Sequence, residues 1–562
     1  MSSADSLILA SVFASAAYLW FKKLEPTDPF SLIVLLGVGP ALPIAVHGLP
    51  FTSIVCSVFA SYATYYISLL LLTALYRLSP LHPLYNYPGP TVGKLSKLWL
   101  VYKSSRGRLN EYFKQVHEKY GPIVRLGPNE LSIVDDTLLP SIIGAQGMPK
   151  GPLWDGRRTN RNMDMDFIKA NLIGARDFKQ HADARKSWNR AFTSSSVKTY
   201  EPILIRRTTQ LIDELRTKCI NGKGGRAHVD LALWLGYFSL DFMGDFVFSG
   251  AFELMRDGDK EGLVPLMEAG TYIAALTQHI PWCLDIISFS PTLFRLAFGK
   301  MKGLGEFAFR QAIRRMKEVP MQSDLMYYLN EEGQMDSNPP PAPLVLWSAV
   351  IAVIAGSDGP ASALSNAVYE LLCNPQCFGR LRAEVDSAFP PNAGEPINTA
   401  RLSRMEYLNA FINEVLRLHP PIATCLQRAP TEGSGGHMLG SSIFIPEGVA
   451  VYAAPYVYQR DPRYFAPDPD RFWPERWLSA KDTDIVVNTN AYIPFSIGPA
   501  NCVGKPLALM QLRMVIGYFV QAFDVSFAEG YDKQRWETEL RDYFITHRGS
   551  LPVILTPRPS AR

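Results

Sequence analysis

FSIGPANCVGKPLA, residues 495–508, is the stretch of sequence that decides the fold. A single cysteine, Cys502, stands between Gly498 and Gly504, and Pro506 follows where an apolar helical pattern begins. Glycine allows a loop to turn sharply and lets backbone approach another group closely. Proline suits the first turn of a helix, whose N-terminal N–H groups stabilise a nearby anion. This spacing predicts a loop that presents one sulfur atom at the start of a helix, and the alternative is a cysteine buried for packing alone.

Two further motifs accompany this loop. Glu414 and Arg417 stand three residues apart in NEVLR, which makes them neighbours on a helix, and Arg476 follows in PERW. In order and spacing, the three motifs resemble those of the cytochrome P450 haem-thiolate monooxygenases, and the wording GPANCVGK resembles fungal members. The loop residues that carry the resemblance are Phe495, Gly498, Cys502 and Gly504. The resemblance covers the chain from about residue 80 to its end.

The resemblance implies the cytochrome P450 fold, a mainly helical α+β domain with a long buried central helix over the haem and small β-sheets. The stretch LVLWSAVIAVIAGS (344–357) agrees with it, because a helix that is apolar on every face must be buried. The resemblance also implies haem b (iron protoporphyrin IX) with the Cys502 thiolate as axial ligand to iron. Glu414, Arg417 and Arg476 would form a hydrogen-bonded ionic network that holds the haem-side core.

By the same resemblance, three residues should bind the haem propionates. His181 and Arg185 lie in HADAR, which is similar to the W/H-x-x-x-R helix motif of the family, and Arg428 is placed like a strand arginine of the family. The arginine that stands two residues before the cysteine in the family motif is replaced by Ala500. This change removes one propionate contact and makes the other cations more important.

The buried helix departs more sharply from the family. AGSDGPASAL (355–364) resembles A-G-x-D/E-T-T, in which an acid and an alcohol deliver protons during dioxygen activation. The acid is kept as Asp358, but Gly359 stands at the threonine position and Pro360 follows it. Proline cannot donate to the carbonyl four residues back, which is that of Gly356, so we expect a kink and a slightly wider pocket.

Several interpretations of this change stay open. Water, Ser357, Ser362 or a substrate hydroxyl could complete proton delivery with Asp358, and monooxygenation would continue. The enzyme could instead be an isomerase or dehydratase of oxygenated substrates, or use a peroxide. The site could also be degraded and bind haem without turnover, and Asp358 could be a structural residue only.

The N-terminal part predicts a membrane anchor at residues 1–77 with about three transmembrane segments. Residues 7–21 are apolar and end at Lys22 and Lys23, and no charged residue lies between positions 28 and 77. Each helical crossing needs about 20 apolar residues. The alternatives are a cleaved signal peptide for the first segment, which lacks a basic start and a clear cleavage site, and a re-entrant or interfacial pair at residues 29–76, which prolines interrupt. The two lysines favour the cytosol for their loop and for the catalytic domain. A proline-rich hinge at 78–90 then leads to the catalytic domain at 91–562.

Composition narrows the class of protein and its partners. The net charge of +4 is spread without a basic run, which argues against nucleic acid. Seven cysteines form no dense framework and favour a reducing compartment. No flavin or nicotinamide motif occurs, so the resemblance implies electrons from NADPH–cytochrome P450 reductase of the endoplasmic reticulum. By analogy with the family, the expected substrate is a hydrophobic small molecule, a terpenoid or polyketide secondary metabolite, that contacts residues 148–173, 352–356 and 421–426. A non-catalytic polytopic membrane transporter or scaffold is the alternative of another class, and it predicts no chromophore.

Overall fold

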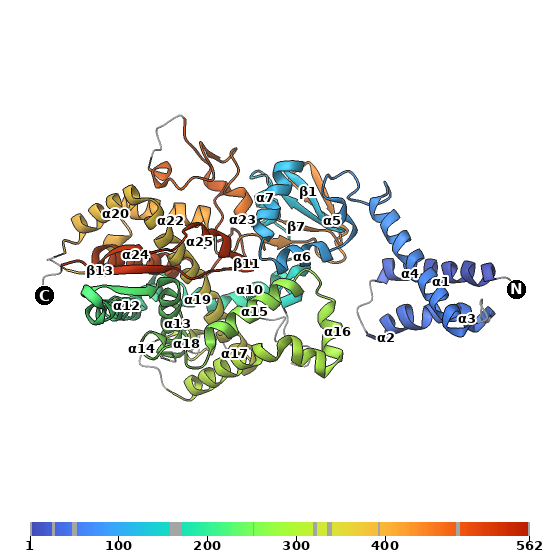
Figure 1. Cartoon of the computed structure of the whole chain (residues 1–562), viewed down its shortest axis with the longest axis horizontal. Helices are drawn as coiled ribbons and strands as arrows, with labels where there is room; N and C mark the ends of the chain where they lie inside the picture. Colours follow the sequence, from blue (N-terminus) through green and yellow to red (C-terminus); the bar gives the residue numbers. More distant parts are fainter. Residues whose placement is uncertain are drawn as a thin grey trace.

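The computed structural model describes residues 3–24, 29–47, 53–157, 171–250, 252–318, 323–333, 340–391, 394–478 and 484–559. A small group of N-terminal helices stands beside a larger, mainly helical body with small sheets, and the two chain ends lie at opposite ends of the long axis (Figure 1). Mainly helical architecture with small sheets is the predicted fold class, and it is confirmed.

Two long apolar helices dominate the N-terminal part. Helix α1 (Ser3–Leu24) packs on α4 (Ile54–Leu78), and a shorter irregular helix lies between them in the chain. The irregular helix consists of α2 (Pro29–Leu32), the π-helix η1 (Ile33–Val38), the 3-10 turn η2 (Gly39–Ala41) and α3 (Leu42–His47). Its regular hydrogen bonding is interrupted where Pro40, which has no N–H group, follows two glycines.

Hydroxyl groups of α4 repair this interruption. Ser61, Tyr62 and Tyr65 donate to carbonyl oxygens of the irregular helix at 2.6, 2.7 and 2.6 Å, respectively. An unpaired carbonyl group costs several kcal/mol in lipid because no water can reach it. The polar side chains in this apolar segment therefore satisfy backbone that a regular helix would satisfy by itself.

Among the described helices, four are long and apolar enough to cross a membrane, namely α1 (from Ala4), α4, α13 (Leu231–Phe248) and α19 (Ala342–Cys373). Helix α13 is largely buried and α19 runs through the core, so these two belong to the larger body. The apolar helix over residues 30–46 is shorter than the other two N-terminal helices. The N-terminal helix is present as expected for a membrane anchor, and the number of spans stays a prediction.

The proline-rich segment after α4 packs on the larger body. His82 and Leu84 are buried, and fully buried Arg125 of strand β1 (Ile123–Gly127) donates to the carbonyl of Arg77 at 2.9 Å. The same guanidinium donates twice to the carbonyl of Pro128. Arg125 therefore connects the end of α4 directly to the first strand.

Glycine–proline turns around two short β-rich runs at 120–135 predict a hairpin, and the structure forms one. Strand β1 pairs antiparallel with β2 (Glu130–Ile133), with Ile123 opposite Ile133. These strands belong to a four-stranded sheet in the order β1-β2-β7-β4, completed by β7 (Ala450–Tyr452) and β4 (Gln427–Arg428). A three-stranded sheet of β10 (Phe523–Phe527), β13 (Pro552–Pro557) and β3 (Ala227–Asp230) closes the other side. The small sheets frame the helical core instead of forming its centre.

Helix α19 is the centre of the larger hydrophobic core. It packs on α13, α17 (Pro291–Lys317) and α24 (Lys505–Ala522), and it continues as one helix through Pro360. Gly356 allows close contact with α13, because a Cβ there would collide with the sulfur of Met243. The apolar pattern along 344–357 therefore reports burial between several helices, as the sequence predicts.

A buried ionic network joins α22 (Glu406–Leu418) to the segment η5 (Pro474–Trp477). Arg417 makes a bidentate pair with Glu414 at 2.8 and 2.9 Å, and Nε of Arg476 donates to Glu414 at 3.0 Å. All three side chains are fully buried. The indole of Trp477 and the backbone N–H of Trp473 also donate to the carboxylate, at 2.9 and 2.8 Å.

Replacing Glu414 by glutamine should destabilise the protein by about 3–5 kcal/mol, because two buried guanidinium groups would lose their counter-charge. The measurement is the denaturant midpoint of the full chain in detergent. Exposed Glu432 provides the matched control, since Glu432→Gln should change stability by less than about 0.5 kcal/mol. Equal midpoints for the two variants would contradict the importance of the network.

Candidate functional site

The loop that carries Cys502 lies between the two hydrophobic cores. Phe495 packs against the larger core and Ile497 against the core around the four-stranded sheet. The backbone N–H of Cys502 donates to the carbonyl of Phe495 at 2.9 Å, which closes the loop. Helix α24 begins at Lys505 with Gly504 as its N-cap, so the cysteine precedes the helix directly.

Two sets of interactions shift the pKa of the Cys502 thiol in opposite directions. Burial raises the pKa of the Cys502 thiol, whereas hydrogen bonds from the backbone N–H groups of Gly504 and Lys505, together with the charge of Arg185, act to lower it. The N–H groups at the start of α24 therefore stabilise the thiolate form of Cys502, although burial of the sulfur disfavours this form. A metal cation at the sulfur would deprotonate it outright.

The two glycines beside Cys502 have different roles. Gly498 has a φ angle of +73°, and a Cβ there would lie 2.7 Å from the backbone carbon of Gly144, so no side chain fits. Gly504 has an ordinary φ angle of −79°, and a Cβ there would make normal contacts of 3.8 Å with Phe192 and 3.9 Å with Cys502. Protein atoms therefore exclude a side chain at Gly498, whereas the described residues leave room for a Cβ at Gly504, and the role of Gly504 beside the haem stays a prediction.

Cationic side chains gather on the same side of the fold. His181 and Arg185 come from α10 (Phe178–Ala191) and Arg428 from β4, and Lys150 forms a β-bridge with Arg428. Burial together with the charges of Lys150, Arg185 and Arg428 lowers the pKa of His181 to about 3, so this imidazole is neutral. Burial also lowers the pKa of Arg428 to about 10.

These guanidinium groups lack acidic partners in the part of the chain that the structure describes. Arg428 is 3% exposed and donates to the carbonyl of its neighbour Gln427, and no carboxylate pairs with it or with Arg185. Arg185 instead donates to the backbone and side-chain oxygens of Asn501 at 2.7 and 2.8 Å. A buried cation without a counter-charge, such as Arg428, is costly, and Arg185 is partly exposed beside it. Their arrangement beside a cysteine therefore fits a dianionic ligand such as the two propionates of a haem.

Gly359 of helix α19 borders open space. A Cβ on Gly359 would have no protein atom within 4 Å, and Ala355, one turn earlier, is exposed. The hydroxyl of Ser357 donates to the carbonyl of Val353 at 2.7 Å, whereas the Ser362 hydroxyl is buried and has no partner among the described residues. Burial raises the pKa of Asp358 and the charge of Arg548 acts to lower it.

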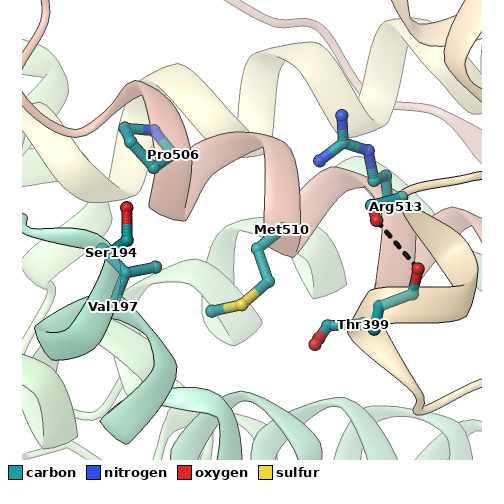
Figure 2. Close-up of a pocket in the computed structure, with 8 residues that line it drawn as sticks. Ser194, Val197, Thr399, Pro506, Met510 and Arg513 are labelled. Carbon is teal, nitrogen blue, oxygen red and sulfur yellow. Dashed lines mark hydrogen bonds between the residues drawn. The ribbon is translucent and has the colours of Figure 1, made fainter.

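A surface pocket of about 450 Å³ lies at the start of α24, next to the cysteine loop (Figure 2). Ser194 and Val197 of α11 (Ser194–Thr199), Pro506 and Met510 of α24, and Arg513 line it. Burial lowers the pKa of Arg513, whose Nε donates to Asn409 at 2.8 Å. Thr399, Ala400 and Ser403, in or next to α21 (Thr399–Leu402), close the remaining side.

Comparison with known proteins agrees with this geometry. The family model described as Cytochrome P450 matches residues 86–550. The chain belongs to the cytochrome P450 family. It is 30% identical over 501 residues to tryprostatin B 6-hydroxylase of Aspergillus fumigatus, which covers 88% of this chain and 84% of the relative. It is 30% identical over 562 residues to Cytochrome P450 67 of Uromyces fabae, with 97% and 98% of the two chains covered. Cytochrome P450 monooxygenase FCK2 of Fusarium pseudograminearum is 31% identical over 494 residues, or 87% and 85% of the chains.

Membership establishes an enzyme of the cytochrome P450 monooxygenase class, whose members carry haem with a cysteine thiolate ligand. This P450 has fungal secondary-metabolite relatives, as the wording of its cysteine loop suggests. The alternative of a non-catalytic transporter or scaffold is therefore wrong. Part of the expected substrate-contact region, residues 158–170, lies outside the described residues.

Three residues of this P450 site were not predicted from the sequence. Lys150 donates to the carbonyls of Leu172 and Ile173 at 2.7 and 2.9 Å, and its charge helps to lower the pKa of His181. Asn501 holds Arg185, and Arg548 lies beside Asp358. A lone lysine, asparagine or arginine in a loop gives no sequence signal, because its partners come from distant segments.

The two glycines of the loop allow a matched test. Gly498→Ala should abolish haem incorporation, because it combines a clash with a left-handed backbone that costs about 1–2 kcal/mol for other residues. Gly504→Ala should keep at least half of the haem content, since its Cβ meets only ordinary contacts. Haem content per purified chain is measured by pyridine haemochrome absorbance. Equal loss in both variants would show that the close approach at Gly498 is not the reason for glycine.

Proposed function

We propose that this P450 binds haem b through the Cys502 thiolate and inserts one oxygen atom from O₂ into a hydrophobic secondary metabolite, with electrons from NADPH–cytochrome P450 reductase. The observation that carries the proposal is the position of the Cys502 sulfur. Backbone N–H groups of α24 point to it, and the acid-free guanidinium groups of Arg185 and Arg428 lie on the same side of the fold.

Each polar residue of this chain then has a role. Haem, when bound, supplies the redox chemistry that activates dioxygen, and the thiolate is the strong electron donor that this chemistry needs. Arg185, Arg428 and Lys150 neutralise the propionates, and neutral His181 can donate one hydrogen bond to them. Asp358 holds a proton for the reaction on the side of α19 next to Gly359.

The substrate class rests on the relatives and on the lining of α19. The relatives include tryprostatin B 6-hydroxylase, whose name states a hydroxylation of a fungal metabolite. Buried Ala352 and exposed Ala355 give α19 a small apolar surface before Gly359. The segment 421–426 is held beside it, since the N–H of Thr546 in β12 (Ile545–His547) donates to the carbonyl of Pro421 at 2.8 Å. Small side chains leave room for a bulky, apolar terpenoid or polyketide.

The surface around the pocket of Figure 2 supports reductase docking. Exposed basic side chains adjoin the lining residues in the chain, namely Lys198, Arg401, Arg404 and Lys505. An acidic partner surface would be attracted to this face, and the Cys502 loop ends next to it, at the beginning of α24. The apolar helices α1 and α4 would keep both proteins at the endoplasmic reticulum membrane, with the catalytic domain in the cytosol and the anchor crossing the bilayer more than once.

A second candidate activity is favoured by one observation. The hydroxyl of Ser357 is engaged by the Val353 carbonyl, Gly359 offers no hydroxyl, and the unpaired hydroxyl of Ser362 is buried, so α19 offers no exposed alcohol in the open space at Gly359. An isomerase, dehydratase or peroxide-dependent reaction needs no delivery of protons for O₂ reduction. Comparing turnover driven by NADPH with turnover driven by hydrogen peroxide distinguishes these activities from monooxygenation.

Cys502→Ser should remove the thiolate-specific absorbance of the reduced carbon monoxide complex completely. Exposed Cys56 provides the control, because Cys56→Ser lies in α4 and should leave the spectrum unchanged. The measurement is the reduced-minus-oxidised spectrum under carbon monoxide of the detergent-purified full chain. A native spectrum in Cys502→Ser would overturn the ligand assignment.

Gly359→Thr should still fold and bind haem, because nothing outside its own helix backbone and chain neighbours lies within 4 Å of the new Cβ, although a Cβ directly before Pro360 costs some helix stability. If glycine is adapted to the substrate, the product formed per NADPH consumed should fall by about twofold or more, since the added methyl and hydroxyl occupy substrate space. Haem content and coupling are measured side by side. A large gain in coupling would show that Gly359 is a loss and not an adaptation.

A further inference from the structure

Helix α19 carries a buried carboxylate oxygen that no hydrogen-bond donor of the described residues reaches. The Oδ2 atom of Asp358 is buried and has no hydrogen-bond partner among the described residues. A buried carboxylate in this state is costly unless a cation compensates it. Arg548, which follows strand β12, is the cation that acts on Asp358.

The Arg548 guanidinium contacts two helices, α19 and α13. Its Nη1 donates to the backbone carbonyl of Asp358 at 3.3 Å. Its Nη2 lies 3.4 Å from the place where a Cβ on Gly236 of α13 would stand. The guanidinium therefore packs directly on α13, the helix that packs on α19.

The chain on both sides of Arg548 is anchored. His547 Nε2 lies 2.5 Å from the hydroxyl of Thr271 on α15 (Leu263–Thr277). The N–H of Leu551 donates to Asp230, the N-cap residue of α13, at 2.9 Å. Arg548 is thus held by its own backbone as well as by its contacts.

A second carboxylate completes the group from the outer side. Glu268 of α15 is exposed and interacts electrostatically with both Arg548 and Asp358. Glu268 is exposed, Arg548 and Asp358 are both partly buried, and the Oδ2 atom of Asp358 is buried. Ionisable groups that lead inward in this order are suited to bring protons from solvent to the interior.

We propose that Arg548 is a positioning residue for Asp358, and that Glu268, Arg548 and Asp358 form the route by which solvent protons reach the interior beside Gly359. The proposal rests on the role of Asp358 proposed above. Arg548 keeps its proton and orders the carboxylates and the water between them, while Glu268 and Asp358 take up and release protons. The monooxygenase reaction consumes two protons with two electrons from the reductase and O₂, and it yields one inserted oxygen atom and one water.

The charged surroundings give the sign of the expected effect. Burial raises the pKa of Asp358 and Arg548 lowers it, so removal of Arg548 should raise that pKa further and keep Asp358 protonated to higher pH. The other ionisable groups near Arg548 are Asp230, which attracts it, and His547, whose pKa is lowered to about 4 by burial and by Arg548. His547 is therefore neutral near pH 7 and cannot replace the lost charge.

The first test is an infrared titration of the haem-loaded full chain, with Asp358→Asn as the blank that identifies the Asp358 carboxylic acid band. Arg548→Gln should move the midpoint of this band upward by about one pH unit or more, and Arg548→Lys should restore most of the native midpoint. Identical midpoints in the native chain and in Arg548→Gln would overturn the inference. The carbon monoxide spectrum verifies that each variant is folded.

The second test measures NADPH oxidation by the full chain with NADPH–cytochrome P450 reductase, in H₂O and in D₂O. Arg548→Gln should slow it roughly tenfold and enlarge the solvent isotope effect, with a smaller loss for Glu268→Gln and recovery in Arg548→Lys. Exposed Glu261 and Arg535 supply matched controls, since Glu261→Gln and Arg535→Gln should behave as native.

The outcomes separate the two proposals. If Asp358→Asn leaves both the rate and the isotope effect unchanged, the role proposed for Asp358 fails. If Asp358→Asn slows the reaction but Arg548→Gln does not, only the inference about Arg548 fails. Should Arg548→Gln not fold, Glu268→Gln tests the same route, because it removes the outer carboxylate and leaves Arg548 in place, and a native rate and isotope effect in Glu268→Gln would then overturn the inference.

Discussion

The carboxylate of Glu414 is the group on which the geometry of the cysteine loop depends. It is the shared counter-charge of Arg417 and Arg476, and all three side chains are fully buried. It also accepts the indole N–H of Trp477. Such a buried pair adds little net stability over apolar packing, but removing one partner is severe. The network therefore acts mainly by fixing orientation.

That orientation is passed to the loop through a short series of contacts. Arg417 also donates to the carbonyl of Gln459 at 2.7 Å, and the Gln459 side chain accepts the N–H of Ile493 at 3.0 Å. Trp477 meets Tyr492 edge to face, with ring centroids 4.8 Å apart. Residues 492 and 493 immediately precede the cysteine loop, so α22 and η5 determine where this loop begins.

In two places of the molecule, side chains satisfy backbone carbonyls that the regular structure leaves unpaired, and in a third place charged side chains lack a partner of opposite charge in the described part of the chain. In the N-terminal helices, hydroxyls of α4 satisfy the carbonyls of an irregular helix. In the catalytic domain, Arg125 satisfies the backbone between α4 and the first sheet. The guanidinium groups of Arg185 and Arg428 have no acidic partner among the described residues, and this difference marks them as ligand-binding groups instead of structural ones.

The sequence by itself determined the family, the mainly helical fold, the hairpin at 120–135 and the apolar N-terminal helix, because these depend on local spacing and on periodic patterns. Only the tertiary structure decided that Gly498 but not Gly504 excludes a side chain, since the deciding contact comes from Gly144. It also decided the partners of Arg185 and Asp358, which lie 316 and 190 residues away in the chain. Residues so far apart leave no local pattern, because their contact exists only once the core has brought their helices and loops together.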